Sequence, residues 1–188
     1  MKKTLIGCAI SIMSLSFAGE TYAAGKSAST ASGTAFHKGA FYVGPSLGLG
    51  SGMGYLGGVA ILANAEYAVT NDIGIGGSIG YWGYSQDYAT ILGKYSYSYT
   101  IIPIVASGAY HFHLNNNKLD LGVGLSLGYY IVNISTSGSA LGGTSAGGSG
   151  IAWGIFGLVR YFVTDTIGLR GKLGYGVSVV ELGVDFRF

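Results

Sequence analysis

The chain has 188 residues, enough for one domain, and its composition is unlike that of an ordinary soluble protein. Glycine contributes 35 residues and tyrosine 15, while charged residues make up only 10% of the chain against the usual quarter. Intrinsic disorder is excluded because it requires low hydrophobicity and high charge, whereas 49% of these residues are apolar. The formal net charge of +2 gives no reason to expect a nucleic-acid partner.

Residues 1–23 have the features of a secretory signal peptide. Lys2 and Lys3 precede a mainly apolar run from Leu5 to Ala18, and small residues follow that run. The only cysteine, Cys8, lies inside this segment, so we expect an exported chain without disulfides. Residues 24–39 are rich in Ser, Ala, Thr and Gly and lack periodicity, which predicts a flexible periplasmic segment.

From residue 40 onward, apolar side chains alternate with small or polar ones in eight successive segments. Strict alternation is typical of a strand with hydrocarbon on one side and a polar environment on the other. The expected strands are, in chain order, Phe41–Gly50, Leu56–Val69, Ile73–Tyr84, Tyr95–Phe112, Leu119–Ser135, Ile151–Val163, Ile167–Val177 and Glu181–Phe188.

The connections between these segments also alternate in character. Those after the second, fourth and sixth segments are polar turns, whereas Ser85–Lys94 and Thr136–Gly150 are interpreted as longer loops. Short periplasmic turns and longer outer loops are typical of outer-membrane barrels. For the segment Tyr95–Phe112 the sequence does not decide which side chains point outward, because residues 101–105 are apolar on both faces. A bulge at Pro103 would explain this.

A transmembrane helix is the main alternative, because no charged residue occurs between Asp120 and Arg160. Gly122, Gly124 and Gly128 interrupt that region, and each interior glycine costs a helix about 1 kcal/mol. The apolar period there is two rather than 3.6. The sequence therefore favours an all-β fold over residues 40–188, an eight-stranded antiparallel up-and-down transmembrane β-barrel.

Aromatic residues gather near both ends of the predicted outward face, as in the two girdles of a membrane barrel. Trp153 and Tyr161 lie eight residues apart, which in a tilted strand is roughly 20 Å along the membrane normal. One predicted girdle contains Tyr81, Tyr129, Trp153 and Tyr175, and the other contains Phe41, Tyr67, Tyr161 and Phe188.

The end of the chain resembles the C-terminal signal of outer-membrane proteins, with a polar residue, a glycine and two aromatics at Glu181, Gly183, Phe186 and Phe188. The layout of residues 40–188 resembles the small eight-stranded barrels typified by OmpX, the OmpA membrane domain and the opacity proteins. This resemblance implies a monomer in outer-membrane lipid, inserted by the barrel-assembly machinery.

Charged residues on the predicted inward face are balanced in sign. An eight-stranded barrel is just wide enough for side chains to fill it, so we expect an ion-pair network that closes the lumen. A last hairpin turning around Ser178–Val179 would place Lys172 opposite Asp185. The alternative is an anion site or narrow pore lined by arginines. The predicted lumen residues are Glu66, Asp120, Arg160, Arg170, Lys172, Glu181, Asp185 and Arg187.

The sequence offers little for catalysis or metal binding. His111 and His113 could share a face, but no third ligand is near them, and the mature chain has no His-x-Ser pair at an outer rim. We therefore expect no catalytic, cofactor-binding or metal residues. The expected function is structural or cell-surface, in adhesion or envelope integrity, with Thr136–Gly150 as an adhesive surface or a solvated loop. The alternative is a narrow porin-like channel for small solutes or apolar molecules.

Overall fold

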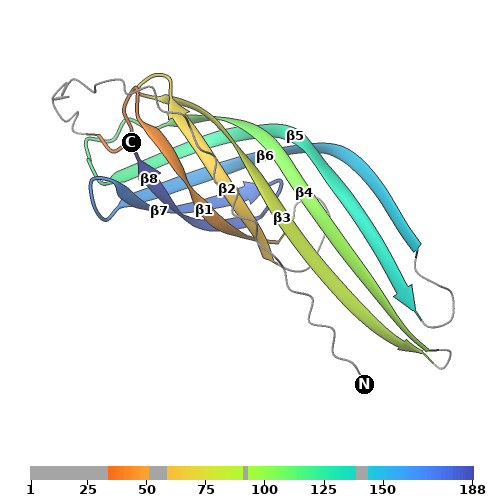
Figure 1. Ribbon diagram of the computed structural model, residues 1–188. Helices are drawn as coiled ribbons and strands as arrows, with labels where there is room; N and C mark the ends of the chain where they lie inside the picture. The colour runs from red at the N-terminus through yellow and green to blue at the C-terminus, as the bar shows by residue number, and fades with distance from the viewer. Residues whose placement is uncertain (1–33, 51–58, 91–92, 139–143) are drawn as a thin grey trace, which may run out of the picture. The chain divides into compact units, whose positions relative to one another are not determined.

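The computed structural model describes residues 34–50, 59–90, 93–138 and 144–188, and these residues confirm the all-β prediction. They form one closed barrel in which each strand pairs antiparallel with its neighbours in the chain and β1 pairs with β8 (Figure 1). No helix in these ranges is long and apolar enough to cross a membrane. The strands are β1 (Phe41–Leu49), β2 (Val59–Ala68), β3 (Ile73–Thr90), β4 (Gly93–His111), β5 (Leu119–Gly138), β6 (Thr144–Phe162), β7 (Ile167–Tyr175) and β8 (Val180–Arg187).

The alternation of residue types along each strand separates two faces of the barrel. In β2, Ile61 is 61% exposed on the outside, whereas its neighbours Ala60 and Leu62 are buried inside. An outer surface so rich in exposed Leu, Ile and Val would be unfavourable in water and suits lipid hydrocarbon. All the predicted girdle residues are exposed on this face: Phe41, Tyr67, Tyr81, Tyr129, Trp153, Tyr161, Tyr175 and Phe188.

One end of the barrel, here called the turn end, carries three short polar connections. In the first, Thr70 Oγ1 accepts hydrogen bonds from the backbone N–H groups of Asp72 and Ile73. Thr164 repeats this arrangement two hairpins later, and Asn116 does the same with its side-chain carbonyl. Such side chains form tight turns because their oxygens satisfy backbone donors that have no strand partner.

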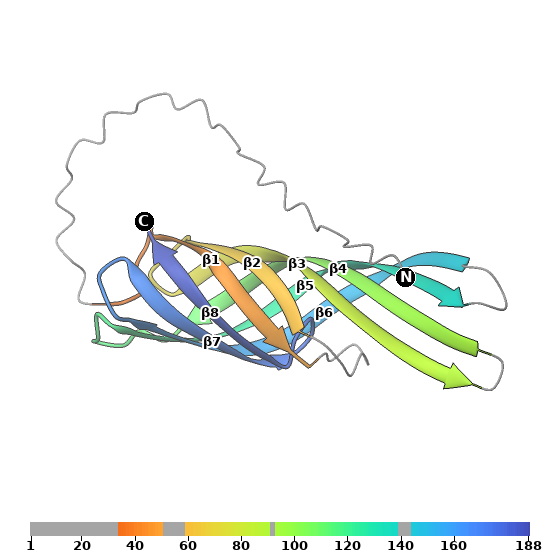
Figure 2. The ribbon, with the colours of Figure 1, turned by 60° about the horizontal axis from the view of Figure 1, so that its bottom comes forward.

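At the opposite end, β3, β4, β5 and β6 run well beyond the other strands (Figures 1 and 2). We call this part, residues 83–90, 93–100, 131–138 and 144–150, the hairpin extension. Its pairing is continuous, with Tyr84 opposite Tyr99 and Thr136 opposite Thr144. The predicted loops Ser85–Lys94 and Thr136–Gly150 are therefore wrong over most of their length, because tyrosine and threonine, both good strand formers, continue the ladders.

The strand around Pro103 contains no bulge, so that expectation is wrong. Pro103 pairs with Tyr130 of β5 in an unbroken ladder, and Ile101, Pro103 and Val105 are buried in the lumen. On the β3 side the ladder is open beside Pro103 but resumes in the same register. Proline has no N–H to donate, which explains a gap in the ladder without a change of phase.

The last hairpin turns earlier than predicted, and the predicted Lys172–Asp185 pair is wrong for this reason. The turn falls at Gly176, whose φ of 147° is accessible only to glycine at low cost, and the backbone N–H of Gly174 donates to the carbonyl of Val179. Lys172 consequently lies opposite Glu181.

The close approach of strands at inward glycines leads to a first prediction. A Cβ at Gly128 would collide with the backbone of Ile104 and Val105, whereas a Cβ at the outward Gly108 would meet nothing within 4 Å. We expect Gly128→Val to lower the free energy of unfolding by about 1–3 kcal/mol through overpacking. Gly108→Val is the matched control and should leave stability unchanged or higher. Urea unfolding in lipid vesicles measures both, and equal midpoints for the two variants would contradict the prediction.

Candidate functional site

Arg160 lies in the lumen, two residues before β6 ends at the turn end, and is 1% exposed. Its guanidinium donates to carboxylates from three other strands: Nε to Asp185 at 2.6 Å, Nη1 to Asp120 at 2.8 Å, and Nη2 to Glu66 at 2.7 Å. The Tyr42 ring lies 4.2 Å from the guanidinium carbon. The planar fork of arginine suits such multiple pairing because its donors point in fixed, divergent directions. One side chain thus links β2, β5, β6 and β8 across the barrel.

Two further cations extend these pairs along the lumen. Arg170 of β7 donates to Asp185 at 2.7 Å and to Glu181 at 3.2 Å, and Lys172 Nζ lies 3.2 Å from the other oxygen of Glu181. Asp185 therefore bridges the two arginines. The structure brings together seven of the eight predicted lumen residues: Glu66, Asp120, Arg160, Arg170, Lys172, Glu181 and Asp185.

Arg187 does not join this network. Its guanidinium lies 4.2 Å from the centre of the Phe162 ring and donates to the backbone carbonyls of Asp165 and Ala35. Arg187 therefore links β8 to the β6–β7 turn and to the segment before β1 at the turn end. The arginine cluster considered as an anion site does not form, because the two other arginines are occupied by carboxylates.

His111 is the network member that the sequence interpretation missed. It is 1% exposed, with Nδ1 2.8 Å from Asp120 and Nε2 2.9 Å from Glu66. An ionised carboxylate can only accept hydrogen bonds, so this geometry requires a hydrogen on both ring nitrogens, which is the charged imidazolium. With His111 in place of Arg187, four cations face four carboxylates. Knowing which face of β4 points inward would have identified His111 as a lumen residue, since it continues the alternating inward series of Ile101 and Val105.

Residues 34–40 close the lumen at the turn end. The Phe36 ring stacks on the His111 ring with centroids 3.6 Å apart and planes 4° apart, and Ala35 and Phe36 are both buried. The Tyr42 hydroxyl donates to the carbonyl of Ala35 at 3.1 Å. Within the predicted flexible segment 24–39, Ala35 and Phe36 are therefore packed, whereas Lys38 and Gly39 are exposed. Residues 24–33 and the predicted signal peptide lie outside the described residues.

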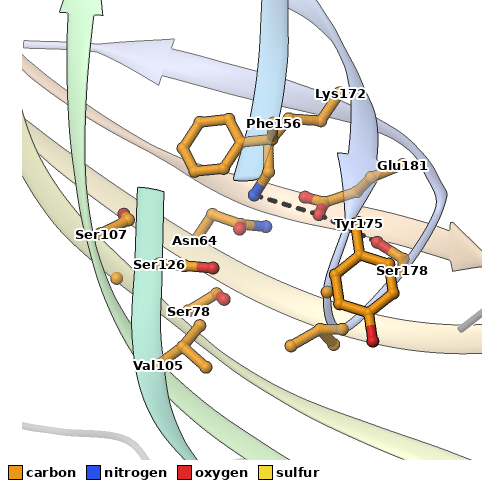
Figure 3. A pocket seen from close by; sticks show the side chains of 13 residues that line it. Asn64, Ser78, Val105, Ser107, Ser126, Phe156, Lys172, Tyr175, Ser178 and Glu181 are labelled. Atoms are coloured by element: carbon orange, nitrogen blue, oxygen red, sulfur yellow. Dashed lines mark hydrogen bonds and ion pairs between the residues drawn. The ribbon is translucent and has the colours of Figure 1, made fainter. Parts of the chain in front are cut away.

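On the other side of the network is a small polar cavity of about 40 Å³ (Figure 3). Hydroxyl and amide side chains line it, and Lys172 and Glu181 meet at its wall. By volume it holds roughly two or three water molecules. Beyond it, the packed side chains of Ala60, Leu62, Trp82, Ile101 and Val132 form an apolar layer. The lumen thus contains, from the turn end, the Phe36 cluster, the ion-pair network, the cavity and the apolar layer around Trp82.

The two histidines considered as metal ligands are separated. Strand β4 ends at His111, and His113 lies in the following turn, where it is exposed 3.5 Å from Asp72. Among the described residues no cluster of three suitable side chains is placed to hold a metal ion.

The C-terminal residues that resemble an assembly signal divide between the two faces of β8. Glu181 lies in the lumen, and a Cβ on Gly183 would meet the Ser46 side chain and the backbone of Pro45. Phe186 and Phe188 point outward, 40% and 76% exposed. Phe188 also completes the seam of the barrel, because its backbone exchanges two hydrogen bonds with Phe41.

Comparison with known proteins places this architecture among outer-membrane barrels. Two structures of Ail, the attachment invasion locus protein of Yersinia pestis, match at 17% identity with TM-scores of 0.50 and 0.52, the second in complex with the heparin analogue sucrose octasulfate. Each covers 80% of this chain and 99% of its own. The N-terminal β-barrel domain of Pseudomonas aeruginosa OprF covers 80% of this chain and 98% of its own, at 17% identity and a TM-score of 0.48. No family model and no curated protein matches the sequence.

The closed barrel, its apolar outer belt and its charged, filled lumen define a small transmembrane β-barrel of the outer-membrane type. The chain has the eight-stranded fold shared by the OmpX-like and OmpA-like barrels, so the fold implied by the resemblance is confirmed.

The network yields a second prediction. Replacing Arg160 with methionine leaves three buried carboxylates without their shared cation, so Arg160→Met should lower the free energy of unfolding by about 3–5 kcal/mol. Lys172→Met is the matched control: that side chain is 22% exposed and has one carboxylate partner, so about 1 kcal/mol or less is expected. Urea unfolding in vesicles compares them, and equal losses would show that the three pairs of Arg160 do not act as a unit.

Proposed function

We propose that the protein is a non-enzymatic outer-membrane barrel that conducts no solutes and displays its hairpin extension outside the cell, in a structural or adhesive role. The observation that supports a closed barrel most directly is Arg160, which ties three carboxylates together across the lumen. The Phe36 layer on one side and the Trp82 layer on the other add two further obstructions.

A narrow channel, the second candidate, is less well supported by this arrangement. A passage for solutes would require the buried charged pairs to separate, and breaking one such pair costs several kcal/mol. The small polar cavity lies between filled layers and does not by itself provide a route.

The two ends of the barrel support an orientation. In outer-membrane barrels the short turns face the periplasm and the longer connections face outward. The turn end also holds Phe188, at the end of the stretch that resembles the signal read by the barrel-assembly machinery. We therefore place the turn end in the periplasm and the hairpin extension outside, with lipid around the belt between them.

The hairpin extension has features of a binding surface. Among the described residues, β3 beyond Trp82 has no pairing with β2, and β6 before Ile155 has none with β7. Such free strand edges offer backbone donors and acceptors to a partner. Ail is by its name an attachment protein, and adhesion is proposed for this chain on the geometry of its own extension.

The closed lumen predicts the electrical behaviour of the barrel. Refolded protein added to a planar lipid bilayer should give no unit conductance, because the ion-pair network and the two apolar layers obstruct the lumen. The same sample should shift its gel mobility on heating, which shows that the barrel is folded, and an open porin added afterwards should conduct in the same bilayer. Reproducible unit steps from the heat-modifiable sample would favour the channel instead.

The orientation predicts which residues reagents can reach. The sequence has one cysteine, Cys8, in the predicted signal peptide, so new cysteines can be labelled selectively. On intact cells a membrane-impermeant maleimide should label Ser149→Cys in the extension. Thr164→Cys at the turn end should react only after the outer membrane is permeabilised. The reverse pattern would overturn the orientation, and with it surface display.

A further inference from the structure

The hairpin extension has two faces of different chemistry. Its outer face carries hydroxyl and acidic groups that bond to one another: Ser85 Oγ lies 3.0 Å from Ser98 Oγ, and Ser96 donates to Asp87 at 2.5 Å. The inner face, which continues the lumen wall, is aromatic and aliphatic instead. Tyr84 on this face is 38% exposed. The extension is thus an amphipathic sheet whose aromatic face lies over the barrel mouth.

The strand register orders the inner face into rows. The row at the mouth contains the buried side chains of Trp82, Ile101 and Val132. In the next row outward, Tyr84 lies opposite Tyr99 and Tyr99 lies opposite Ile134. Tyr84 and Tyr99 thus lie one row beyond the packed apolar layer. Tyrosine offers a large, rigid contact area at low cost in conformational entropy.

On β6 the inner face of the extension carries small residues. Ala146 lies opposite Ile134 and Gly148 opposite Val132, and both are exposed. A Cβ built on Gly148 would meet nothing within 4 Å, so the space above this glycine is open. Glycine inside a strand often marks a place where a ligand or another backbone approaches closely. The inner face therefore combines the rings of Tyr84 and Tyr99, here called the wall, with the open surface over Ala146 and Gly148, here called the shelf.

We propose that this shelf binds a neutral oligosaccharide, with sugar rings lying on Gly148 and stacking against Tyr84 and Tyr99. The negative face of an aromatic ring attracts the C–H groups on the apolar face of a sugar. Tyrosine hydroxyls at the wall and the hydroxyls of Thr136 and Thr144 supply donors and acceptors for sugar hydroxyls. This inference rests on the proposed display of the extension outside the cell.

The charge of the inner face favours a neutral ligand over the alternatives. The described side chains on this face carry no charge, so a polyanion such as sucrose octasulfate would find no cationic partner there. A polypeptide strand would pair along a sheet edge and would not contact the shelf. A substitution that fills the shelf should therefore weaken the binding of a glycan and leave the binding of a peptide unchanged.

Binding can be followed through Trp82, at the base of the tyrosine rows. The sequence contains two tryptophans, so Trp153→Phe leaves Trp82 as the only reporter. We expect a saturable change in its fluorescence when maltohexaose or chitohexaose is added to the refolded barrel in a zwitterionic detergent without a sugar headgroup. Gly148→Leu, which fills the shelf, should weaken binding at least about tenfold, as should Tyr99→Leu. Ser149→Leu, on the opposite face of the same strand, is the control and should bind unchanged.

Several outcomes would overturn the inference. These are no response and no calorimetric heat with either sugar up to about 10 mM, equal weakening by Ser149→Leu, or binding of an uncharged alternating Val-Thr peptide alone. Heat-modifiability of each variant confirms folding, and Tyr99→Leu serves if Gly148→Leu does not fold. Surface labelling of Ser149→Cys without sugar binding removes only this inference. Sugar binding without surface labelling removes the proposed function.

Discussion

The structure depends on the neutralisation of charge inside a lumen too narrow for bulk water. Four carboxylates from β2, β5 and β8 are held by Arg160, Arg170, Lys172 and His111, and each carboxylate has at least two partners. Taking ions out of water costs several kcal/mol each, and only near-complete pairing offsets that cost. The pairs that Glu66 makes with Arg160 and His111 join strands that are not neighbours in the sheet, so these two pairs can form only when the barrel has closed.

The same network determines how the turn end is sealed. His111 carries its charge at the edge of the network, and its outer face offers a flat surface that Phe36 covers. The segment before β1 is held there by backbone bonds as well, since Ala35 donates to the carbonyl of Asn116 and accepts from Arg187. Closure of the lumen and attachment of the N-terminal segment are therefore parts of one arrangement.

The sequence predicted the faces of the strands better than their partners. Period two is a local property, so Glu66, Arg160 and Asp185 could be assigned to the lumen from the residues next to them. Pairing depends on where each hairpin turns. The last hairpin turns at Gly176, so the partner of Lys172 is Glu181 and not the predicted Asp185. His111 was missed because residues 101–105 are apolar on both faces, which hid the phase of β4. Phe36, a single aromatic in a stretch of small residues, has no periodic signal at all.

Within the hairpin extension, Ser85–Lys94 and Thr136–Gly150 were interpreted as loops, whereas residues 95–100 and 131–135 were placed in predicted strands. In the extension the contrast between the two faces reverses above the aromatic girdle. In the belt, β4 places Ile102 and Ile104 outside, whereas above it the outward positions are Ser98 and Thr100 and the tyrosines lie inside. The backbone phase is unchanged and only the residue types exchange faces. An aromatic face turned toward water contributes nothing to lipid contact, and in the described part of the chain the pairing of the extension with β2 and β7 ends at Trp82 and Ile155. Strand propensity explains why tyrosines continue these ladders, and a ligand on the shelf would explain why they gather on the inner face.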